Sequence, residues 1–184
     1  MLRQQINEHL ESVIGETIWS AVAGPQGDYV LSLELGARRP RSMRLANPRL
    51  SFLKSTYEGE YGFLIECPWR IDAPDRVVVS YLGVLGQKDP PPADRIDVLE
   101  GLTVMGIHAE PPVWDLTVRL SEGYVLRCFS AEVDVGRKRG NWSLWSPEGP
   151  LQIGPAGRVK DIQASDRRAD LRRRLQAVED EDDA

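Results

Sequence analysis

Two segments of the chain share one pattern, and an internal repeat constrains a fold more strongly than any single motif. Each segment opens with a Gly-x-Thr-aliphatic run, at residues 15–19 and again at residues 101–105. An alternating strand follows in each, led by Asp and closed by Gly, at residues 28–36 and 115–123. Alternation with period two is typical of antiparallel strands that bury one face. The pattern therefore predicts two similar antiparallel β units.

The two copies also correspond in detail. The apolar positions of the first alternating strand match those of the second, namely Tyr29, Leu31 and Leu33 with Leu116, Val118 and Leu120. Each strand is expected to return after its Gly, at residues 42–45 in the first copy and 124–129 in the second, with an insertion at residues 37–42 in the first. Farther on, Trp69 and Trp142 each precede an aliphatic residue by two positions. These tryptophans are predicted to anchor the core.

The chain is divided by a proline-rich stretch at residues 87–95, because consecutive prolines lack amide donors and continue neither strand nor helix. This linker predicts a first β unit over residues 1–86 and a second over residues 96–160. Helical spacing of apolar residues predicts an amphipathic helix before Gly15, a glycine suited to the position just after a helix. Its apolar residues are Leu2, Ile6, Leu10, Val13 and Ile14.

A second helix is expected at the C-terminal end, over residues 161–178, followed by an acidic disordered tail at residues 179–184. Its apolar stripe is narrow and includes Leu171 and Leu175. Such a helix either docks weakly on its own domain or pairs with another chain. The predicted fold class is α+β and mostly β, with the two units sharing a core between terminal helices.

The charge balance excludes some partners. A formal net charge of −5 disfavours non-specific binding to nucleic acid or to anionic membranes, which both need a positive field. No apolar run approaches the length of a membrane span, and the first residues lack the apolar core of a signal peptide. Cys67 and Cys128 each lie in an apolar stretch, as reduced core thiols do. These features predict a cytoplasmic protein.

The supply of catalytic groups is thin. His9 and His108 are the two histidines, and a dyad of His108 with Cys67 or Cys128 stays open as an alternative without a family signature around it. The scattered cysteines and histidines lack the paired spacing of a zinc site. No Gly-rich phosphate or dinucleotide motif is present. The sequence therefore predicts a protein without catalytic residues, metal or cofactor.

Two basic clusters stand out against this acidic chain, one near the first predicted turn and one near the second. Together with two residues of the C-terminal helix, they are the candidate partner-binding residues: Arg38, Arg39, Arg41, Arg137, Lys138, Arg139, Leu171 and Leu175. Guanidinium and ammonium groups at comparable places in two copies would form a surface for an acidic partner or for a phosphate backbone.

The Gly-x-Thr-aliphatic strand, the Asp-led strand ending in Gly and the Trp-x-aliphatic strand resemble small bacterial proteins of unknown function with duplicated β units. Some of these look like immunity proteins encoded beside polymorphic toxins, and the resemblance covers roughly residues 10–150. It implies a non-enzymatic module that binds another protein and neutralises a toxin. The alternative is a small-molecule binder or minor enzyme with a cavity between the β units, walled by tryptophans: Trp19, Trp69, Trp114, Trp142 and Trp145.

Overall fold

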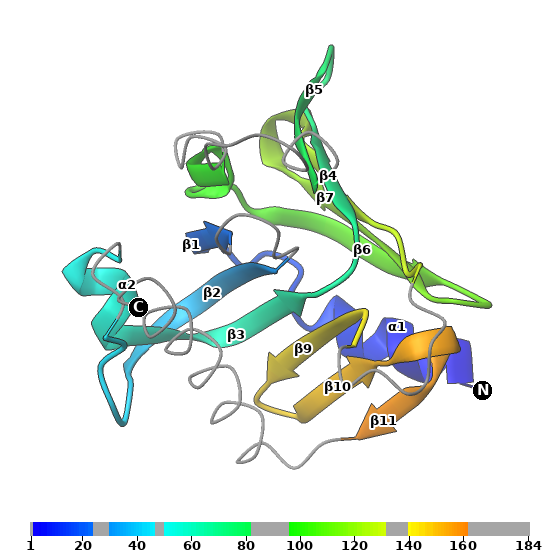
Figure 1. Cartoon of the computed structure of the whole chain (residues 1–184), viewed down its shortest axis with the longest axis horizontal. Helices are drawn as coiled ribbons and strands as arrows, with labels where there is room; N and C mark the ends of the chain where they lie inside the picture. The colour runs from blue at the N-terminus through cyan, green and yellow to red at the C-terminus, as the bar shows by residue number, and fades with distance from the viewer. Residues whose placement is uncertain (1, 24–29, 47–49, 82–95, 132–139, 162–184) are drawn as a thin grey trace, which may run out of the picture.

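The computed structural model describes residues 2–23, 30–46, 50–81, 96–131 and 140–161, which form two antiparallel β-sheets (Figure 1). The first sheet has the strand order β1-β2-β3-β9-β10-β11 and the second has the order β5-β4-β8-β7-β6. The strands of the first sheet are β1 (Ile18–Ala23), β2 (Leu31–Pro40), β3 (Tyr57–Ile65), β9 (Trp142–Ser146), β10 (Gly149–Ile153) and β11 (Val159–Asp161). Those of the second are β4 (Trp69–Asp72), β5 (Val77–Ser80), β6 (Val104–Glu110), β7 (Asp115–Leu120) and β8 (Val125–Cys128). The fold is α+β and mostly β, as the sequence predicted.

Short helices surround the sheets. The described α-helices are α1 (Leu2–Glu11) and α2 (Phe52–Thr56), and the described 3-10 helices are η1 (Asp97–Leu99), η2 (Ser121–Gly123) and η3 (Pro155–Gly157). Within the described part of the chain, no helix has both the length and the apolar content needed to span a bilayer. The predicted linker at residues 87–95, the C-terminal helix and the acidic tail lie outside the described residues.

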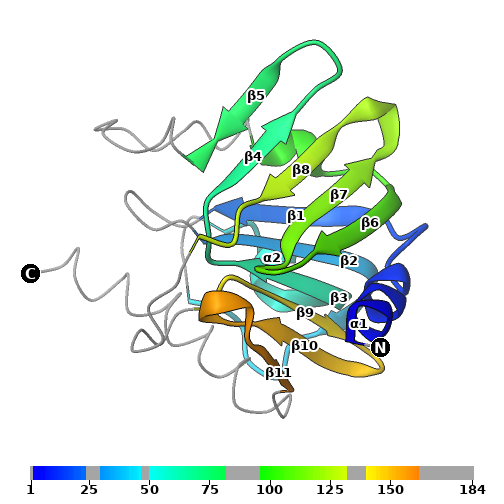
Figure 2. The ribbon, with the colours of Figure 1, turned by 90° about the vertical axis from the view of Figure 1, so that its right-hand side faces the viewer.

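The chain crosses between the sheets twice. Strands β1, β2 and β3 form the first part of the first sheet, and β4 and β5 then join the second sheet. Strands β6, β7 and β8 lie in the second sheet, and β9, β10 and β11 return to the first. Figure 2 shows the two sheets stacked, with α1 at one end of the stack. Each sheet therefore contains strands from both sides of the predicted linker, and the two predicted units exchange their last strands.

Both segments follow the same pairing pattern. Strand β3 pairs with β9, which places Ile65 opposite Trp142, and β8 pairs with β4, which places Cys128 opposite Trp69. The sequence correspondence between the two tryptophans thus matches their places in the sheets. An internal duplication of the sequence itself stays a prediction.

The first strand pair of each segment carries the same irregularity. The β1–β2 register shifts after Ile18, which lies opposite Leu35, and the β6–β7 register shifts after Val104, which lies opposite Leu120. The matching of apolar positions made from the sequence was therefore wrong by two residues, since Leu35 corresponds to Leu120. A slide of two residues leaves a period-two pattern unchanged, so alternation alone does not fix this register.

The predicted return strand at residues 42–45 was also wrong. Strand β2 continues past Gly36 to Pro40, and its antiparallel partner is β3, which begins at Tyr57. The insertion in the first segment is therefore longer than expected, and it contains α2. In the second segment the return strand β8 lies where the sequence predicted it.

Helix α1 packs along β6, the edge strand of the second sheet (Figure 2). Its buried side chains are Ile6 and Leu10, with Val13 just beyond its end, whereas the predicted apolar residues Leu2 and Ile14 are exposed. The Asn7 side-chain oxygen accepts a hydrogen bond of 3.1 Å from the Ala109 amide. This contact satisfies one backbone donor on the free side of an edge strand.

One hydrophobic core joins both sheets. It includes Trp69, Trp114 and Trp142, whereas Trp145 lies on the outward side of the first sheet. The Trp142 indole nitrogen donates a hydrogen bond of 2.7 Å to the Trp114 carbonyl, which satisfies a polar atom inside an apolar environment. The prediction that Trp69 and Trp142 anchor the core is confirmed.

Candidate interaction surface

The first basic cluster lies where β2 leaves the body of the first sheet. Arg38 and Arg39 lie near the C-terminal end of β2, opposite Gly59 and Glu58 of β3. The Arg38 guanidinium carbon lies 5.1 Å from the centre of the Trp19 ring, a cation–π geometry. Both arginine side chains are exposed, and the Arg39 guanidinium pairs with the Glu60 carboxylate at 2.5 Å.

Arg41 has a different environment from Arg38 and Arg39. Its side chain is only 9% exposed and its guanidinium lies 2.5 Å from the Glu34 carboxylate and 3.5 Å from that of Glu58. The second Glu34 oxygen accepts a hydrogen bond of 2.7 Å from the Gly59 amide. Burial raises the pKa of the Glu34 carboxyl, and this effect outweighs the opposing influence of Arg41 and the Gly59 amide. Arg41 therefore holds the insertion against the sheet and offers little surface to a partner.

Two large apolar side chains beside these arginines were missed in the sequence. Met43 is 60% exposed and Phe52, the first residue of α2, is 65% exposed. The Arg44 guanidinium carbon lies 5.2 Å from the centre of the Phe52 ring, and its Nε donates to the Ser55 hydroxyl. The sequence signal was an apolar residue inside an insertion, where no alternation marks a buried face.

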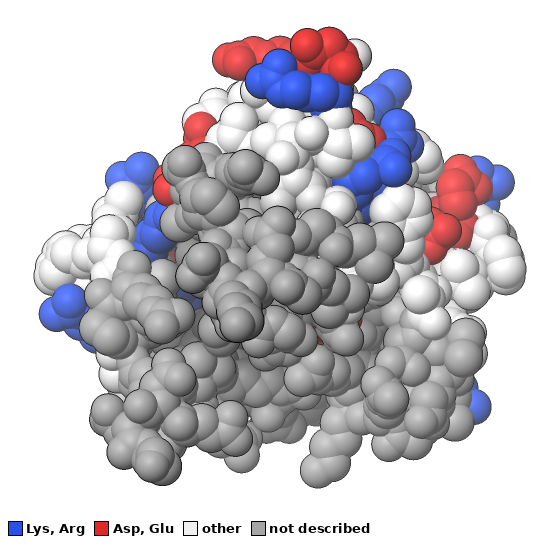
Figure 3. All heavy atoms as spheres, turned by 45° about the horizontal axis from the view of Figure 1, so that its top comes forward, with Lys and Arg blue, Asp and Glu red and all other residues white. Residues whose placement is uncertain are grey.

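Lys54 fixes this region to the sheet. Its ammonium group lies 2.6 Å from the Glu100 carboxylate and donates a hydrogen bond of 3.3 Å to the Ala21 carbonyl of β1. Helix α2 therefore sits beside the strand that carries Trp19. On the left of Figure 1, where α2 lies, the space-filling view shows basic atoms around an uncharged surface (Figure 3). We call this region the α2 corner surface, and its residues are Trp19, Arg38, Arg39, Met43, Arg44 and Phe52.

The remaining candidate residues belong to the second basic cluster and to the predicted C-terminal helix. Arg137, Lys138 and Arg139 of the second basic cluster, and Leu171 and Leu175 of the predicted C-terminal helix, lie outside the described residues.

The structure separates the groups of the predicted cysteine–histidine dyads. Cys67 and Cys128 are buried in the core, whereas His108 points outward from β6 opposite Thr117. Burial raises the pKa of the Cys67 thiol to about 12, and it raises that of Cys128 as well. A buried thiol that stays protonated is a poor nucleophile, so these cysteines act as core residues.

One serine–histidine contact was not foreseen. The Ser146 hydroxyl oxygen lies 3.2 Å from His9 Nε2, but this hydroxyl also donates a hydrogen bond of 3.1 Å to the Gly149 carbonyl. Which of the two atoms donates in the Ser146–His9 contact depends on the tautomer of His9. The contact links α1 to β9.

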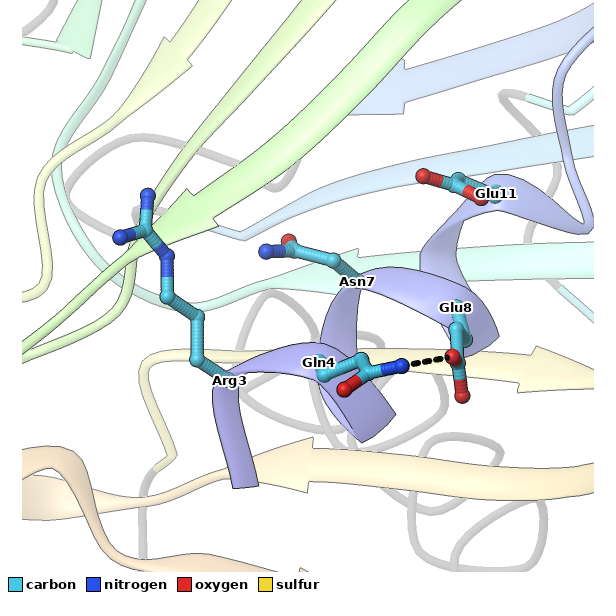
Figure 4. Close-up of a pocket in the computed structure, with 5 residues that line it drawn as sticks. All are labelled: Arg3, Gln4, Asn7, Glu8 and Glu11. Carbon is cyan, nitrogen blue, oxygen red and sulfur yellow. Dashed lines mark hydrogen bonds between the residues drawn. The ribbon is translucent and has the colours of Figure 1, made fainter. Parts of the chain in front are cut away.

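A surface hollow of about 470 Å³ lies on α1 (Figure 4). It is lined by Arg3, Gln4, Asn7, Glu8 and Glu11. Several of these side chains already have partners. Gln4 donates a hydrogen bond to Glu8, and Arg3 forms an ion pair of 2.9 Å with Glu110 of β6. Across the described part of the chain, no group of three potential metal-binding side chains comes together.

Comparisons with protein-family models, curated proteins and solved structures find no match to this chain. The resemblance to immunity-like β proteins therefore rests on the sequence motifs alone.

Proposed function

We propose that this chain is a non-enzymatic protein-binding module that contacts its partner through the α2 corner surface. The carrying observation is the pair of exposed apolar side chains, Met43 and Phe52, in one insertion, with Arg44 stacked on the Phe52 ring. Methionine, aromatic residues and arginine are the types enriched at protein interfaces, and tryptophan and arginine are frequent energetic hot spots.

The local geometry supports a preformed contact site. Arg38 is stacked on Trp19 and Arg44 on Phe52, so both guanidinium groups are oriented before a partner arrives. Lys54 and Arg41 hold the supporting backbone with ion pairs. A rigid surface loses less conformational entropy on binding, which favours affinity without any reactive group.

The finer proposal is that the partner is a toxin that this protein neutralises, as the resemblance to immunity proteins suggests. Covering a toxin's surface needs shape and charge complementarity and no catalysis. Free buried thiols at Cys67 and Cys128 are compatible with a reducing compartment, and we place the protein in the cytoplasm.

The test uses full-length tagged protein to retain partners from nuclease-treated lysate of the native host, with identification by mass spectrometry. The disruptive variant is Met43→Ser/Phe52→Ser. The matched control is Met105→Ser, since Met105 is 61% exposed on the other sheet. We expect one stoichiometric partner with the unchanged protein and with the control, and its loss with the double variant. Equal retention by all three proteins would contradict the proposed surface.

The toxin proposal needs its own measurement. Once a partner is identified, it is expressed under control in a susceptible strain, with and without this protein. Growth restored by the unchanged protein and by Met105→Ser, but not by the double variant, is the expected result. A partner that does not inhibit growth would refute the toxin proposal while leaving the binding surface intact.

A further inference from the structure

The outward face of the second sheet carries a second cluster of arginines, remote in sequence from the α2 corner surface. A row of directly opposed residues crosses the sheet from β5 to β6: Ser80, Arg70, Arg127, Thr117 and His108. Arg119 lies in the next row, opposite Gly106 and Val125. The three arginines therefore share one side of a rigid antiparallel sheet.

Arg70 and Arg127 are like charges at directly opposed positions, an arrangement that disfavours strand pairing. Asp72 offsets it in part, because Arg70 Nη2 and Arg127 Nε both donate to the same Asp72 oxygen, at 3.1 Å and 3.0 Å. One carboxylate shared between two guanidinium groups leaves a net positive charge. The side chains remain 40% and 43% exposed, so an external anion can reach both arginines.

Arg119 adds a further charge to this face. Its guanidinium lies across β6 at Gly106, where an added Cβ would be 2.6 Å from Nη2, so the glycine provides the space. Within the described residues Arg119 has no ion-pair partner. In Figure 3, blue basic atoms lie below and to the right of the group of acidic and basic atoms at the top of the view.

We propose that this arginine face, formed by Arg70, Arg119 and Arg127, binds an acidic segment of a partner protein. Guanidinium groups bind carboxylates through two parallel hydrogen bonds, and Asp72 already orients two of the three. Strand backbones hold the arginines at a fixed spacing, which suits successive carboxylates of an extended acidic peptide.

A nucleic acid fits this face less well than an acidic peptide. The chain has a formal net charge of −5, and exposed Asp75, Glu110 and Glu122 border the second sheet. A long phosphate backbone would meet these carboxylates. The centre of the Phe129 ring, beside the cluster, lies 5.9 Å from the Arg70 guanidinium carbon, so this arginine already stacks on one side of the ring.

The inference is independent of the proposed function, since the arginine face and the α2 corner surface lie on different sheets. Its test is a titration of nitrogen-labelled full-length protein, at low salt, with a hexaglutamate peptide. Hexaglutamine serves as the neutral control and hexathymidylate as the phosphate control. Heteronuclear NMR resolves the arginine Nε–Hε groups and so reports which arginines meet the peptide.

The matched variants are Arg119→Gln/Arg127→Gln and Arg76→Gln, since Arg76 is an exposed arginine at the β4–β5 tip. We expect hexaglutamate to shift the signals of Arg70, Arg119 and Arg127, and the double variant to bind about tenfold more weakly. Arg76→Gln should bind as the unchanged protein does. No shift at these arginines, equal binding by the double variant, or hexathymidylate binding as tight as hexaglutamate would each overturn the proposal.

Discussion

The two segments of the chain agree on their inward sides and differ on their outward sides. Inward, Ile65 opposite Trp142 in one sheet corresponds to Cys128 opposite Trp69 in the other. All four side chains belong to the same buried cluster. A shared core leaves little freedom at these positions, because each side chain must fill space against both sheets.

Outward, the corresponding positions carry opposite charges. Glu34 of β2 lies opposite Ser20 of β1, and Arg119 of β7 lies opposite Gly106 of β6. Each pair comes directly after the register shift of its sheet. Glu34 is covered by the insertion and paired with Arg41, whereas Arg119 is exposed. The insertion of the first segment explains the difference. It covers Glu34 and supplies the opposite charge of Arg41, whereas the side chain of Arg119 in the second segment faces solvent. Function is therefore expected on the outward sides, where the segments diverge.

The largest effect should come from the inward tryptophans. Trp69→Ala and Trp142→Ala are each expected to lower the free energy of unfolding by about 3 to 5 kcal/mol, because each leaves a large cavity in the shared core. Trp142→Ala also removes the hydrogen bond that the indole donates to the Trp114 carbonyl. Urea denaturation followed by circular dichroism measures both.

The exposed residue Met105 provides the control for these variants, since Met105→Ala removes apolar atoms without opening a cavity. A large loss for one tryptophan and a small loss for the other would break the equivalence of the two inward sites.

The outward pair provides the second prediction. Arg41→Met should lower the free energy of unfolding by about 3 kcal/mol, because it leaves the Glu34 carboxylate, with a side chain 13% exposed, without its cation. Arg119→Met should change it by less than about 0.5 kcal/mol, since that side chain is exposed and unpaired among the described residues. Thermal and urea unfolding of both variants compare the two sites.

The Glu34→Gln/Arg41→Met variant tests the cause of this loss. If the lost ion pair is responsible, the double variant should be more stable than Arg41→Met alone, because no buried charge remains unpaired. Equal losses for Arg41→Met and Arg119→Met would show that the insertion does not protect the first site.

The sequence predicted the strands well where apolar residues alternate and poorly where pairing is long-range. The α+β class, the N-terminal helix and the two core tryptophans followed from local patterns. The exchange of β4 and β9 between sheets did not, since which strands become neighbours depends on the whole core and not on any one strand. The two-residue error in matching Leu33, in place of Leu35, to Leu120 has the same origin, because alternation repeats every second residue.

The candidate surface was predicted only in part. Arg38 and Arg39 are exposed, with Arg38 stacked on Trp19, but Arg41, two residues after Arg39, is buried against Glu34. A run of arginines in sequence carries no information on which of them meets a buried carboxylate. Phe52 and Met43 were missed because an exposed apolar side chain looks like a core residue until its surroundings are known.

The last effect is absent at neutral pH and concerns the two thiols, Cys67 and Cys128, that share the core with Trp69 and Trp142. Burial raises the pKa of Cys67 from an ordinary value of 9.0 to about 12. Below pH 9 the thiol is protonated in both folded and unfolded chains, so the stability that this difference contributes is fully present. As the pH rises from 9 towards 12, the unfolded chain releases its proton first, and stability is lost at about 1 kcal/mol per pH unit.

Cys67→Ala should remove this part of the pH dependence, so the difference in free energy of unfolding between the two proteins should shrink as the pH rises above 9. Urea denaturation at several alkaline pH values measures it. In the native state at neutral pH, both thiols should also resist a thiol reagent until the protein unfolds, since Cys128 is buried beside Trp69. A constant difference across this range, or rapid labelling of the folded chain, would mean that the inward side at Cys67 and Cys128 is more open to water than the inward side around Trp142.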